Sequence, residues 1–233
     1  MKSYLNCGIS WTSKMMLFLV LVSLSIQAQD WANLQRYAAE NVKLISAPET
    51  PGRVVFMGNS ITESWPKFHP EYFSSSGYIP RGISGQTTPQ MLVRFRSDVI
   101  DLEPEIVVLL AGTNDIAGNT GPTTLEEILG NIISMCELAK SNGIKVILAS
   151  VLPAYKYPWK PELNPAEEIF ELNQMLKLYA ASADIIYLDY FSAMSDQRKG
   201  LIDKLSYDGV HPNKAGYDVM EALVESALVQ ARL

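Results

Sequence analysis

The chain of 233 residues is poor in the residue types that bind metals and form disulfides, with two cysteines and two histidines. Neither an HExxH nor a CxxC motif is present, so the sequence predicts no conventional zinc site, and we expect no cofactor. If the N-terminal leader described below is removed, Cys136 is the cysteine that remains, and no disulfide can form within the chain. Apolar packing, including Cys136 itself, is therefore expected to stabilise the fold.

The sequence also lacks the usual glycine signatures of nucleotide and hydrolase sites. The stretch SGQTTPQ (84–90) has no Gly-Lys-Ser/Thr and is not a P-loop, and no GxGxxG follows the first strand that we expect. No GxSxG is present, which excludes the usual nucleophile elbow of the α/β-hydrolases. A formal net charge of −6 offers no basic footprint, so neither nucleic acid nor an anionic membrane is expected as a partner.

The N-terminus has the pattern of a targeting segment. Lys14 precedes an uncharged apolar run, MMLFLVLVSLSI, which is followed by QAQD. We interpret residues 1–28 as a secretory signal peptide cleaved near Ala28, and residues 29–233 as one domain. The run is shorter than the ~20 residues of a spanning helix, which favours cleavage over a retained membrane anchor. We therefore expect a secreted or periplasmic protein without stable membrane insertion, and its oligomeric state is left open.

Apolar runs alternate with helical patterns along the rest of the chain. We expect strands at 53–58, 78–83, 105–112, 144–153 and 184–190. We expect helices at 31–46, at about 122–141, at 164–183 and after an Asn213 cap. Continuous apolar strands between helices are typical of a parallel sheet covered on both faces. Pro80 suits an edge strand, which agrees with a doubly wound α/β fold of strand order 2-1-3-4-5.

Polar and glycine-containing clusters follow these expected strands. They read, in chain order, GNSIT, SGQTT, GTND, PAYKYPWKP and YDGVHPN. The carboxyl ends of parallel strands meet at one edge of the sheet, where doubly wound folds bind ligands. Each cluster alone is a weak signal, because Ser60 could be only a helix N-cap and Asn114 only a turn residue.

His211 is the better candidate of the two histidines for a general base near Ser60. A serine nucleophile needs a base that titrates near neutral pH, with a carboxylate to orient it. Asp208 precedes His211 by three residues, and Gly209 permits a tight turn between them, whereas no acid precedes His69 in FHPEYF. The alternative is that Asp208 and His211 only turn the chain before the last helix.

Taken together, the clusters resemble the motif blocks of the SGNH (GDSL-type) hydrolases, in the same order. GNSIT (58–62) resembles the serine block, GISGQTT (82–88) the glycine block, GTND (112–115) the asparagine block and DGVHP (208–212) the terminal block. The resemblance implies a flavodoxin-like three-layer α/β/α fold and ester hydrolysis, close to the platelet-activating-factor acetylhydrolase-like branch. One departure is Asn59, where the usual block has Asp, and its effect is left open.

The resemblance also implies a role for each matching residue. Ser60 would be the nucleophile, His211 the general base and then the acid, and Asp208 the residue that orients His211. The oxyanion hole would consist of the backbone N–H groups of Ser60 and Gly85 and the side-chain amide of Asn114. Three neutral donors suit a tetrahedral oxyanion without adding a competing base. No metal takes part in this set.

The substrate is less well indicated than the reaction. Tyr155, Tyr157 and Trp159 in the loop 153–165 could stack on sugar rings, line an acyl pocket or only pack the loop. Arg81 could meet a carboxylate or a sugar hydroxyl, or form a surface ion pair. The leader and the resemblance favour a secreted esterase that acts on short acyl esters. Acetyl esters of carbohydrates are the first hypothesis for its substrate. The alternatives are a lysophospholipase or other lipid acylhydrolase, and an inactive glycan-binding module.

Overall fold

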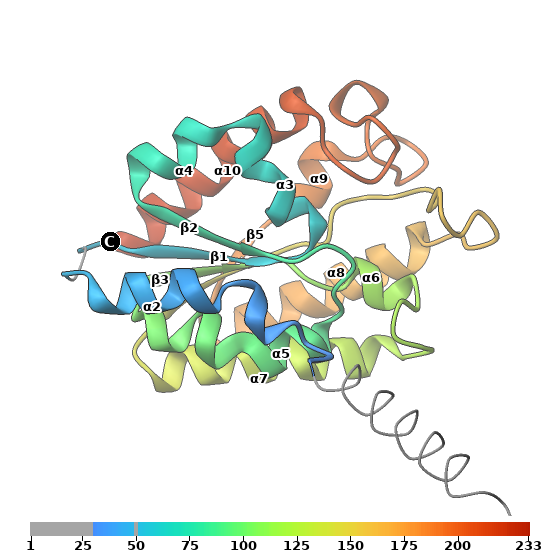
Figure 1. Cartoon of the computed structure of the whole chain (residues 1–233). Coiled ribbons are helices and arrows are strands. Elements are labelled where there is room, and N and C mark those ends of the chain that lie inside the picture. Colours follow the sequence, from blue (N-terminus) through green and yellow to red (C-terminus); the bar gives the residue numbers. More distant parts are fainter. Residues whose placement is uncertain (1–29, 49–50) are drawn as a thin grey trace, which may run out of the picture.

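The computed structural model describes residues 30–48 and 51–233. The signal peptide predicted at 1–28 lies outside these residues and stays a prediction. The described chain forms three layers, with a central sheet between two layers of helices (Figure 1). Within the described ranges, no helix has both the length and the apolar content needed to cross a membrane.

The sheet has five parallel strands in the order β2-β1-β3-β4-β5, as predicted. The strands are β1 (Val54–Gly58), β2 (Tyr78–Gly82), β3 (Ile106–Leu109), β4 (Lys145–Ala149) and β5 (Ile186–Leu188). Pro80 lies in the edge strand β2, opposite Phe56 of β1. An edge strand tolerates proline because its outer side has no ladder partner to receive an N–H.

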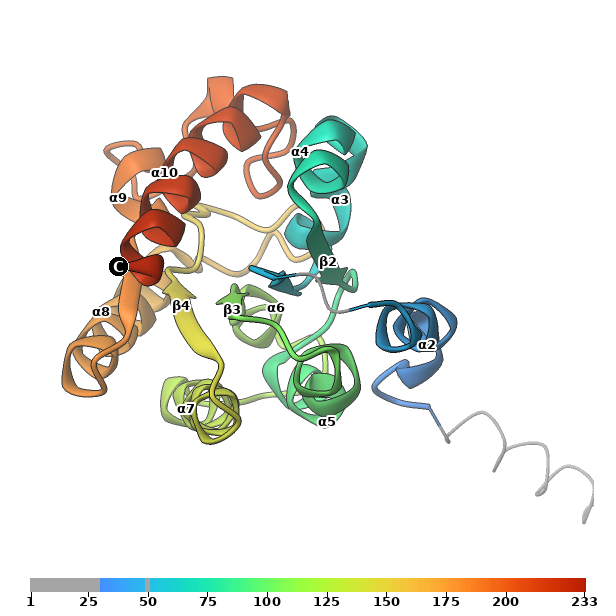
Figure 2. The ribbon, with the colours of Figure 1, turned by 90° about the vertical axis from the view of Figure 1, so that its left-hand side faces the viewer.

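Helices cover both faces of the sheet (Figure 2). One layer contains α5 (Thr88–Asp98), α7 (Leu125–Ser141) and α8 (Ala166–Ser182), with α2 (Ala38–Ser46) beside α5. The opposite layer contains α3 (Ser60–Phe68), α4 (Pro70–Ser76), α9 (Tyr190–Met194) and α10 (Lys214–Arg232). The short α6 (Thr113–Ile116) follows β3, and 3₁₀ turns lie at Leu34–Arg36, Ile100–Leu102 and Asp203–Leu205.

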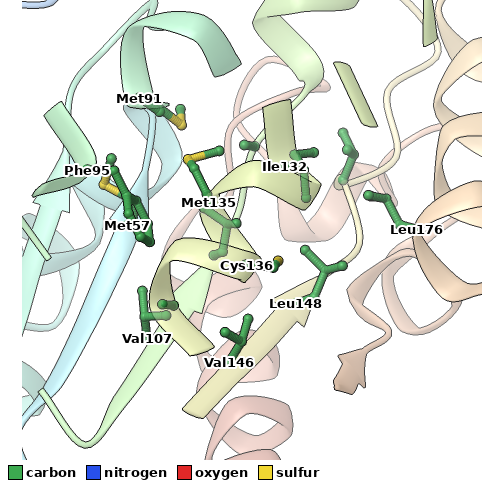
Figure 3. Close-up of a cluster of buried hydrophobic side chains, with 14 of the residues drawn as sticks. Met57, Met91, Phe95, Val107, Ile132, Met135, Cys136, Val146, Leu148 and Leu176 are labelled. Atoms are coloured by element: carbon green, nitrogen blue, oxygen red, sulfur yellow. The ribbon is translucent and has the colours of Figure 1, made fainter. Parts of the chain in front are cut away.

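The sheet separates two apolar clusters, because successive side chains of a strand point to opposite faces. Val55 and Met57 pack with α5, α7 and α8, whereas Val54 and Phe56 pack with the layer that contains α10. Figure 3 shows the first cluster, in which Cys136 lies among apolar side chains. Cys136 is buried there as a free thiol, and burial raises its pKa to about 12. Its interpretation as a core residue is confirmed.

The N-terminal helix is shorter than predicted. The pattern at 31–46 predicts one continuous helix, but the chain forms the 3₁₀ turn Leu34–Arg36 first and enters α2 at Ala38. Asn33 has a φ of 56°, in the left-handed region that a helix interior excludes. The carboxylate of Asp30 accepts the backbone N–H of Leu34 at 2.5 Å and so starts a separate turn.

Strand β4 also ends earlier than the apolar run 144–153 predicts. The run leaves the sheet after Ala149, and the side chain of Asn173 in α8 takes the place of a neighbouring strand. Its Oδ1 accepts the N–H of Val151 at 2.8 Å, and its Nδ2 donates to the carbonyl of Val151 at 2.9 Å. A buried amide on a distant helix satisfies this backbone, which the local pattern of the strand does not reveal.

Candidate active site

Ser60 is the first residue of α3, directly beyond the carboxyl end of β1. Asn59 is the N-cap of this helix, and its Oδ1 accepts the N–H of Ile61 at 3.0 Å. Gly58 has no room for a side chain, because an added Cβ would lie 2.2 Å from Oγ1 of Thr62. The interpretation of Ser60 as only a helix cap is therefore wrong: Asn59 caps α3, and the Ser60 hydroxyl is left for other contacts.

Ser60, His211 and Asp208 form one chain of hydrogen bonds. Oγ of Ser60 lies 3.0 Å from Nε2 of His211, and Nδ1 of His211 lies 2.7 Å from Oδ2 of Asp208. Oδ1 of Asp208 also accepts the backbone N–H groups of His211 at 2.7 Å and Val210 at 2.9 Å. Partial burial opposes ionisation of Asp208, but the hydrogen bonds from His211 and Val210 outweigh it and lower the pKa of this carboxyl.

The segment that carries Asp208 and His211 is a tight turn. Gly209 has a φ of 82°, which a residue with a side chain rarely adopts. Oγ of Ser206 accepts the N–H of Gly209 at 2.8 Å and donates to the carbonyl of His211 at 2.8 Å. The spacing predicts that Asp208 can reach the imidazole, and the observed turn brings the two side chains together in this way.

The glycine and asparagine blocks meet at the same edge of the sheet. The side-chain amide of Asn114, in α6, donates to the carbonyl of Gln86 at 2.9 Å. Gln86 follows Gly85, which has a φ of 78° at the end of the loop after β2. In residues 30–48 and 51–233, the backbone N–H groups of Ser60 and Gly85 donate to no protein acceptor. Both N–H groups are thus available to a ligand, as an oxyanion hole requires.

Two of the predicted loop aromatics lie against each other beside His211. Trp159 is 42% exposed, stacks on Tyr157 at 5.1 Å between ring centroids and lies 5.9 Å from the ring of His211. Tyr157 is fully buried, and its hydroxyl bonds to the carbonyl and the hydroxyl of Thr113. The prediction that Tyr157 contacts substrate is therefore wrong, because this ring supports Trp159 and the β3–α6 turn from inside.

Tyr207 is an aromatic residue of the site that the sequence reasoning missed. Its ring is 59% exposed and stacks on the ring of His211 at 5.8 Å, with 10° between the planes. The one sequence signal was its position directly before Asp208. Because Trp159 also lies near His211, the imidazole has exposed aromatic side chains from two different loops beside it.

Tyr155 lines a pocket together with Asp208. The guanidinium of Arg198 covers its ring at 5.3 Å and is paired with Asp196 at 2.7 Å. A pocket of 170 Å³ opens between Tyr155 and Asp208. Its lining residues are Tyr155, Lys156, Arg198, Gly200, Leu201, Asp203, Asp208 and Gly209.

Arg81 has one of the two roles predicted for it. Its guanidinium is buried on β2, where Nε and Nη2 donate to Oδ1 of Asn41 at 3.0 and 2.8 Å. The same group lies over the ring of Tyr37, 4.5 Å from its centroid. The predicted substrate contact is wrong, because the guanidinium is buried against Asn41 of α2. The predicted ion pair is present, since Nη1 lies 3.5 Å from Oε2 of the exposed Glu40.

His69, the second histidine, lies elsewhere, between two acids of α10. Its Nδ1 is 3.1 Å from Glu221, and its Nε2 is 3.5 Å from Asp218. These three side chains are the group of potential metal ligands found in the described part of the chain. The two carboxylates face different ring nitrogens, and the ammonium of Lys214 lies 3.5 Å from Nε2. His69 is thus an imidazole that hydrogen-bonds to carboxylates and already has a cation, the Lys214 ammonium, beside it.

The family is shown by comparison with known proteins. The sequence profile of the GDSL-like lipase/acylhydrolase family matches residues 56–219. This segment begins within β1 and includes the other four strands and both ends of the hydrogen-bonded chain from Ser60 to Asp208. The chain belongs to this family. The predicted SGNH (GDSL-type) family is thus confirmed, and with it the enzyme class, a GDSL-type acylhydrolase.

Several known proteins are similar to this GDSL-type chain. The solved structure of a GDSL-like lipase from Bacteroides thetaiotaomicron is 50% identical, with a TM-score of 0.83, over 86% of this chain and 98% of that one. A multidomain esterase from Ruminococcus flavefaciens is 30% identical over 80% of this chain and 24% of its own length. An acetylxylan esterase from Xylanibacter ruminicola is 24% identical over 80% of this chain and 45% of its own length. The chain thus spans less than half of these two esterases.

Proposed function

We propose that the protein is a serine esterase that hydrolyses short acyl esters, acetyl esters of carbohydrates above all. The observation that carries this proposal is the chain of hydrogen bonds from Ser60 through His211 to Asp208, with distances of 3.0 and 2.7 Å. A hydroxyl on a neutral imidazole, with a carboxylate on the other ring nitrogen, is the arrangement that activates a serine nucleophile. The carboxylate fixes the tautomer in which Nε2 is free to accept a proton.

The first half of the reaction forms an acyl-enzyme. Nε2 of His211 takes the hydroxyl proton as Oγ of Ser60 attacks the ester carbonyl carbon. The carbonyl oxygen gains the negative charge and accepts hydrogen bonds from the N–H groups of Ser60 and Gly85 and from the amide of Asn114. The imidazolium of His211 then protonates the leaving alcohol, and the C–O bond of the ester breaks.

The second half of the reaction repeats these steps with water. His211 takes a proton from a water molecule, whose oxygen attacks the carbonyl carbon of the acyl-serine. The same donors hold the second oxyanion, and the proton returns to Oγ of Ser60 as the carboxylic acid leaves. Asp208 stays ionised throughout and stabilises the imidazolium, a role that its lowered pKa favours.

The carbohydrate part of the proposal is supported by the aromatic side chains next to His211. Trp159 and Tyr207 offer exposed ring faces, which suit the apolar faces of sugar rings and leave the hydroxyl groups of the sugar in water. The two curated relatives reported above are named a multidomain esterase and an acetylxylan esterase. Export follows in the proposal from the leader predicted at 1–28, since polysaccharide substrates lie outside the cell.

The nucleophile is tested with p-nitrophenyl acetate and no added metal. We expect the purified chain to hydrolyse this ester and Ser60→Ala to abolish the activity. The matched control is Ser75→Ala, because Ser75 is an exposed serine on the neighbouring α4 whose hydroxyl bonds only to its own helix backbone. Hydrolysis by Ser60→Ala at the wild-type rate would refute the proposal, and an inert wild-type chain that still binds glycans would favour the binding-module alternative.

The substrate class is tested by acyl release from a panel of esters. Acetylated xylo-oligosaccharides and other acetylated glycans are set against lysophospholipids and p-nitrophenyl esters of increasing chain length. We expect the highest kcat/KM on acetylated sugars and a fall with acyl length. A preference for long acyl chains or for lysophospholipids would overturn the carbohydrate assignment and leave the lipid acylhydrolase alternative.

A further inference from the structure

Arg94 is a buried cation in α5 whose guanidinium reaches out of its own helix. Its side chain has no exposed surface. Nη1 donates to Oδ2 of Asp98, one turn further along α5, at 2.8 Å. Nη2 donates to the backbone carbonyl of Gly58 at 2.9 Å, and Nε donates to Oε1 of Gln86 at 2.5 Å. One planar group thus joins a helix, the end of a strand and a loop.

Two of these acceptors belong to segments that carry the candidate site. Gly58 is the last residue of β1 and lies two positions before Ser60. Gln86 directly follows Gly85, and its backbone carbonyl holds the amide of Asn114 at 2.9 Å. The guanidinium therefore bonds to the residue two positions before the nucleophile, and to the residue that follows Gly85 and accepts the amide of Asn114.

Burying the charged guanidinium of Arg94 costs desolvation free energy. Arginine is therefore expected at this position only if its geometry is needed to join these segments. Burial lowers the pKa of the Arg94 guanidinium, and the hydrogen bond and charge of Asp98 partly offset this effect. An ion pair within α5 would need only the contact between Arg94 and Asp98. The acceptors on Gly58 and Gln86 match instead the rigid fork of N–H donors that distinguishes arginine from lysine.

We propose that Arg94 is a positioning residue, which sets the spacing between Ser60 and the oxyanion donors at Gly85 and Asn114. The inference rests on the proposed function, because the spacing matters only if these groups act together on one ester. A preorganised oxyanion hole loses its effect when the donors move, and a displacement near 1 Å at a reacting group costs about 10²-fold in rate. Arg94 itself touches neither the substrate nor the reacting atoms.

The first test compares Arg94→Lys with Arg53→Lys. Arg53 is also buried, but it precedes β1 at the opposite end of the strand, where it donates to the carbonyl of Leu102. Active-site titration with a fluorophosphonate that labels Ser60 counts the competent enzyme in each preparation. We expect Arg94→Lys to lower kcat on p-nitrophenyl acetate by about 10²-fold with little change in KM, whereas Arg53→Lys keeps the wild-type kcat. Equal kcat values for the two variants would overturn the proposal.

The second test is chemical rescue. We expect millimolar guanidinium to restore part of the kcat of Arg94→Ala, because the free cation can occupy the cavity and bond to Gly58 and Gln86. The same addition is expected to leave Arg53→Ala unchanged. A folded Arg94→Ala that is not rescued counts against the proposal, and if this variant does not fold, Arg94→Lys decides. Failure of the wild-type chain to react with the fluorophosphonate would remove the proposed function, and this inference with it.

Discussion

Asp115 accepts both the backbone N–H and the hydroxyl of Thr88, at 2.9 and 2.6 Å. Thr88 is the last residue of the glycine block and the first of α5, and Asp115 directly follows Asn114 in the asparagine block. The pair therefore fastens two separate motif blocks to each other beneath the site. It also places a carboxyl where little water reaches it, since Asp115 is buried.

We predict that the burial of Asp115 makes the stability of the fold depend on pH. Burial raises the pKa of Asp115 from 3.8 to about 6, although the bonds from Thr88 oppose the change. A carboxyl whose pKa is raised by folding binds its proton more tightly in the folded chain than in the unfolded chain. Its contribution to the free energy of unfolding is full below about pH 4 and falls by roughly 3 kcal/mol as the pH rises to 6. Urea denaturation across this range measures the fall.

The control for this prediction is Asp115→Asn, which removes the titration but keeps the shape of the side chain. Between pH 4 and 6, we expect the free energy of unfolding of this variant to lack the fall that Asp115 causes in the wild type. Below about pH 4, Asp208→Asn should change the curve in the opposite sense, because the lowered pKa of Asp208 contributes stability that is lost as the pH falls through that lowered value. An unchanged slope in Asp115→Asn would show that Asp115 does not titrate in this range.

The amide of Asn114 is predicted to act in the transition state. Asn114→Ala should lower kcat by roughly 10²–10³-fold with a smaller effect on KM, because one oxyanion donor is lost. The matched control is Asn142→Ala at the exposed end of α7, where the amide donates to the carbonyl of Leu138. Stopped-flow or steady-state hydrolysis of p-nitrophenyl acetate measures both variants. A negligible loss in Asn114→Ala would leave this residue as a turn residue that holds Gln86.

The sequence was sufficient for the topology and for the residues that follow the strands. Continuous apolar runs such as 105–112 suit strands that are buried on both faces, and parallel strands bring their carboxyl ends to one edge. The sequence alone therefore predicts that Ser60, Gly85 and Asn114 lie on neighbouring loops. The sequence also predicts His211 as the base, because the chain has two histidines and only His211 has an acidic residue close before it.

Side-chain direction in the loops and at the sheet edge could not be predicted in the same way. Arg81 is enclosed because α2 folds back over β2, a contact between segments about 40 residues apart that no local pattern encodes. Tyr157 and Trp159 are two positions apart in one loop, yet one is buried and the other is exposed. The stack of Tyr207 on His211 depends on the turn at Gly209, which sets both ring planes.

Trp159 is predicted to act on the sugar and not on the ester. Trp159→Ala should raise KM for acetylated xylo-oligosaccharides by about 5-fold, because a stacking face worth on the order of 1 kcal/mol is lost. Hydrolysis of p-nitrophenyl acetate by the same variant should change little. Tyr155→Ala is the matched control, since Tyr155 is equally exposed at 42% but lies beside Asp208 under Arg198. Equal losses on both substrates would show that Trp159 acts by supporting His211.

We predict that, among the glycines, Gly82 matters most for the position of Ser60. It ends β2 directly under the first turn of α3, and an added Cβ would lie 2.1 Å from the backbone nitrogen of Glu63 and 2.6 Å from the carbonyl oxygen of Asn59. These backbone atoms belong to the first turn of α3 and its cap, and they cannot move aside without shifting Ser60. We expect Gly82→Ala to lower the free energy of unfolding by about 3 kcal/mol and to reduce kcat in the protein that still folds.

The matched control is Gly130→Ala in α7, where an added Cβ meets nothing within 4 Å. An alanine in a helix interior is favoured over glycine by roughly 0.5–1 kcal/mol, so this variant should be more stable than wild type with the same kcat. Urea denaturation gives both free energies, and titration of Ser60 with a fluorophosphonate gives the fraction of competent sites. If Gly82→Ala is as stable and as active as Gly130→Ala, then α3 can move away from β2 without disturbing Ser60. In that case the close packing of α3 on β2 does not hold the nucleophile in place.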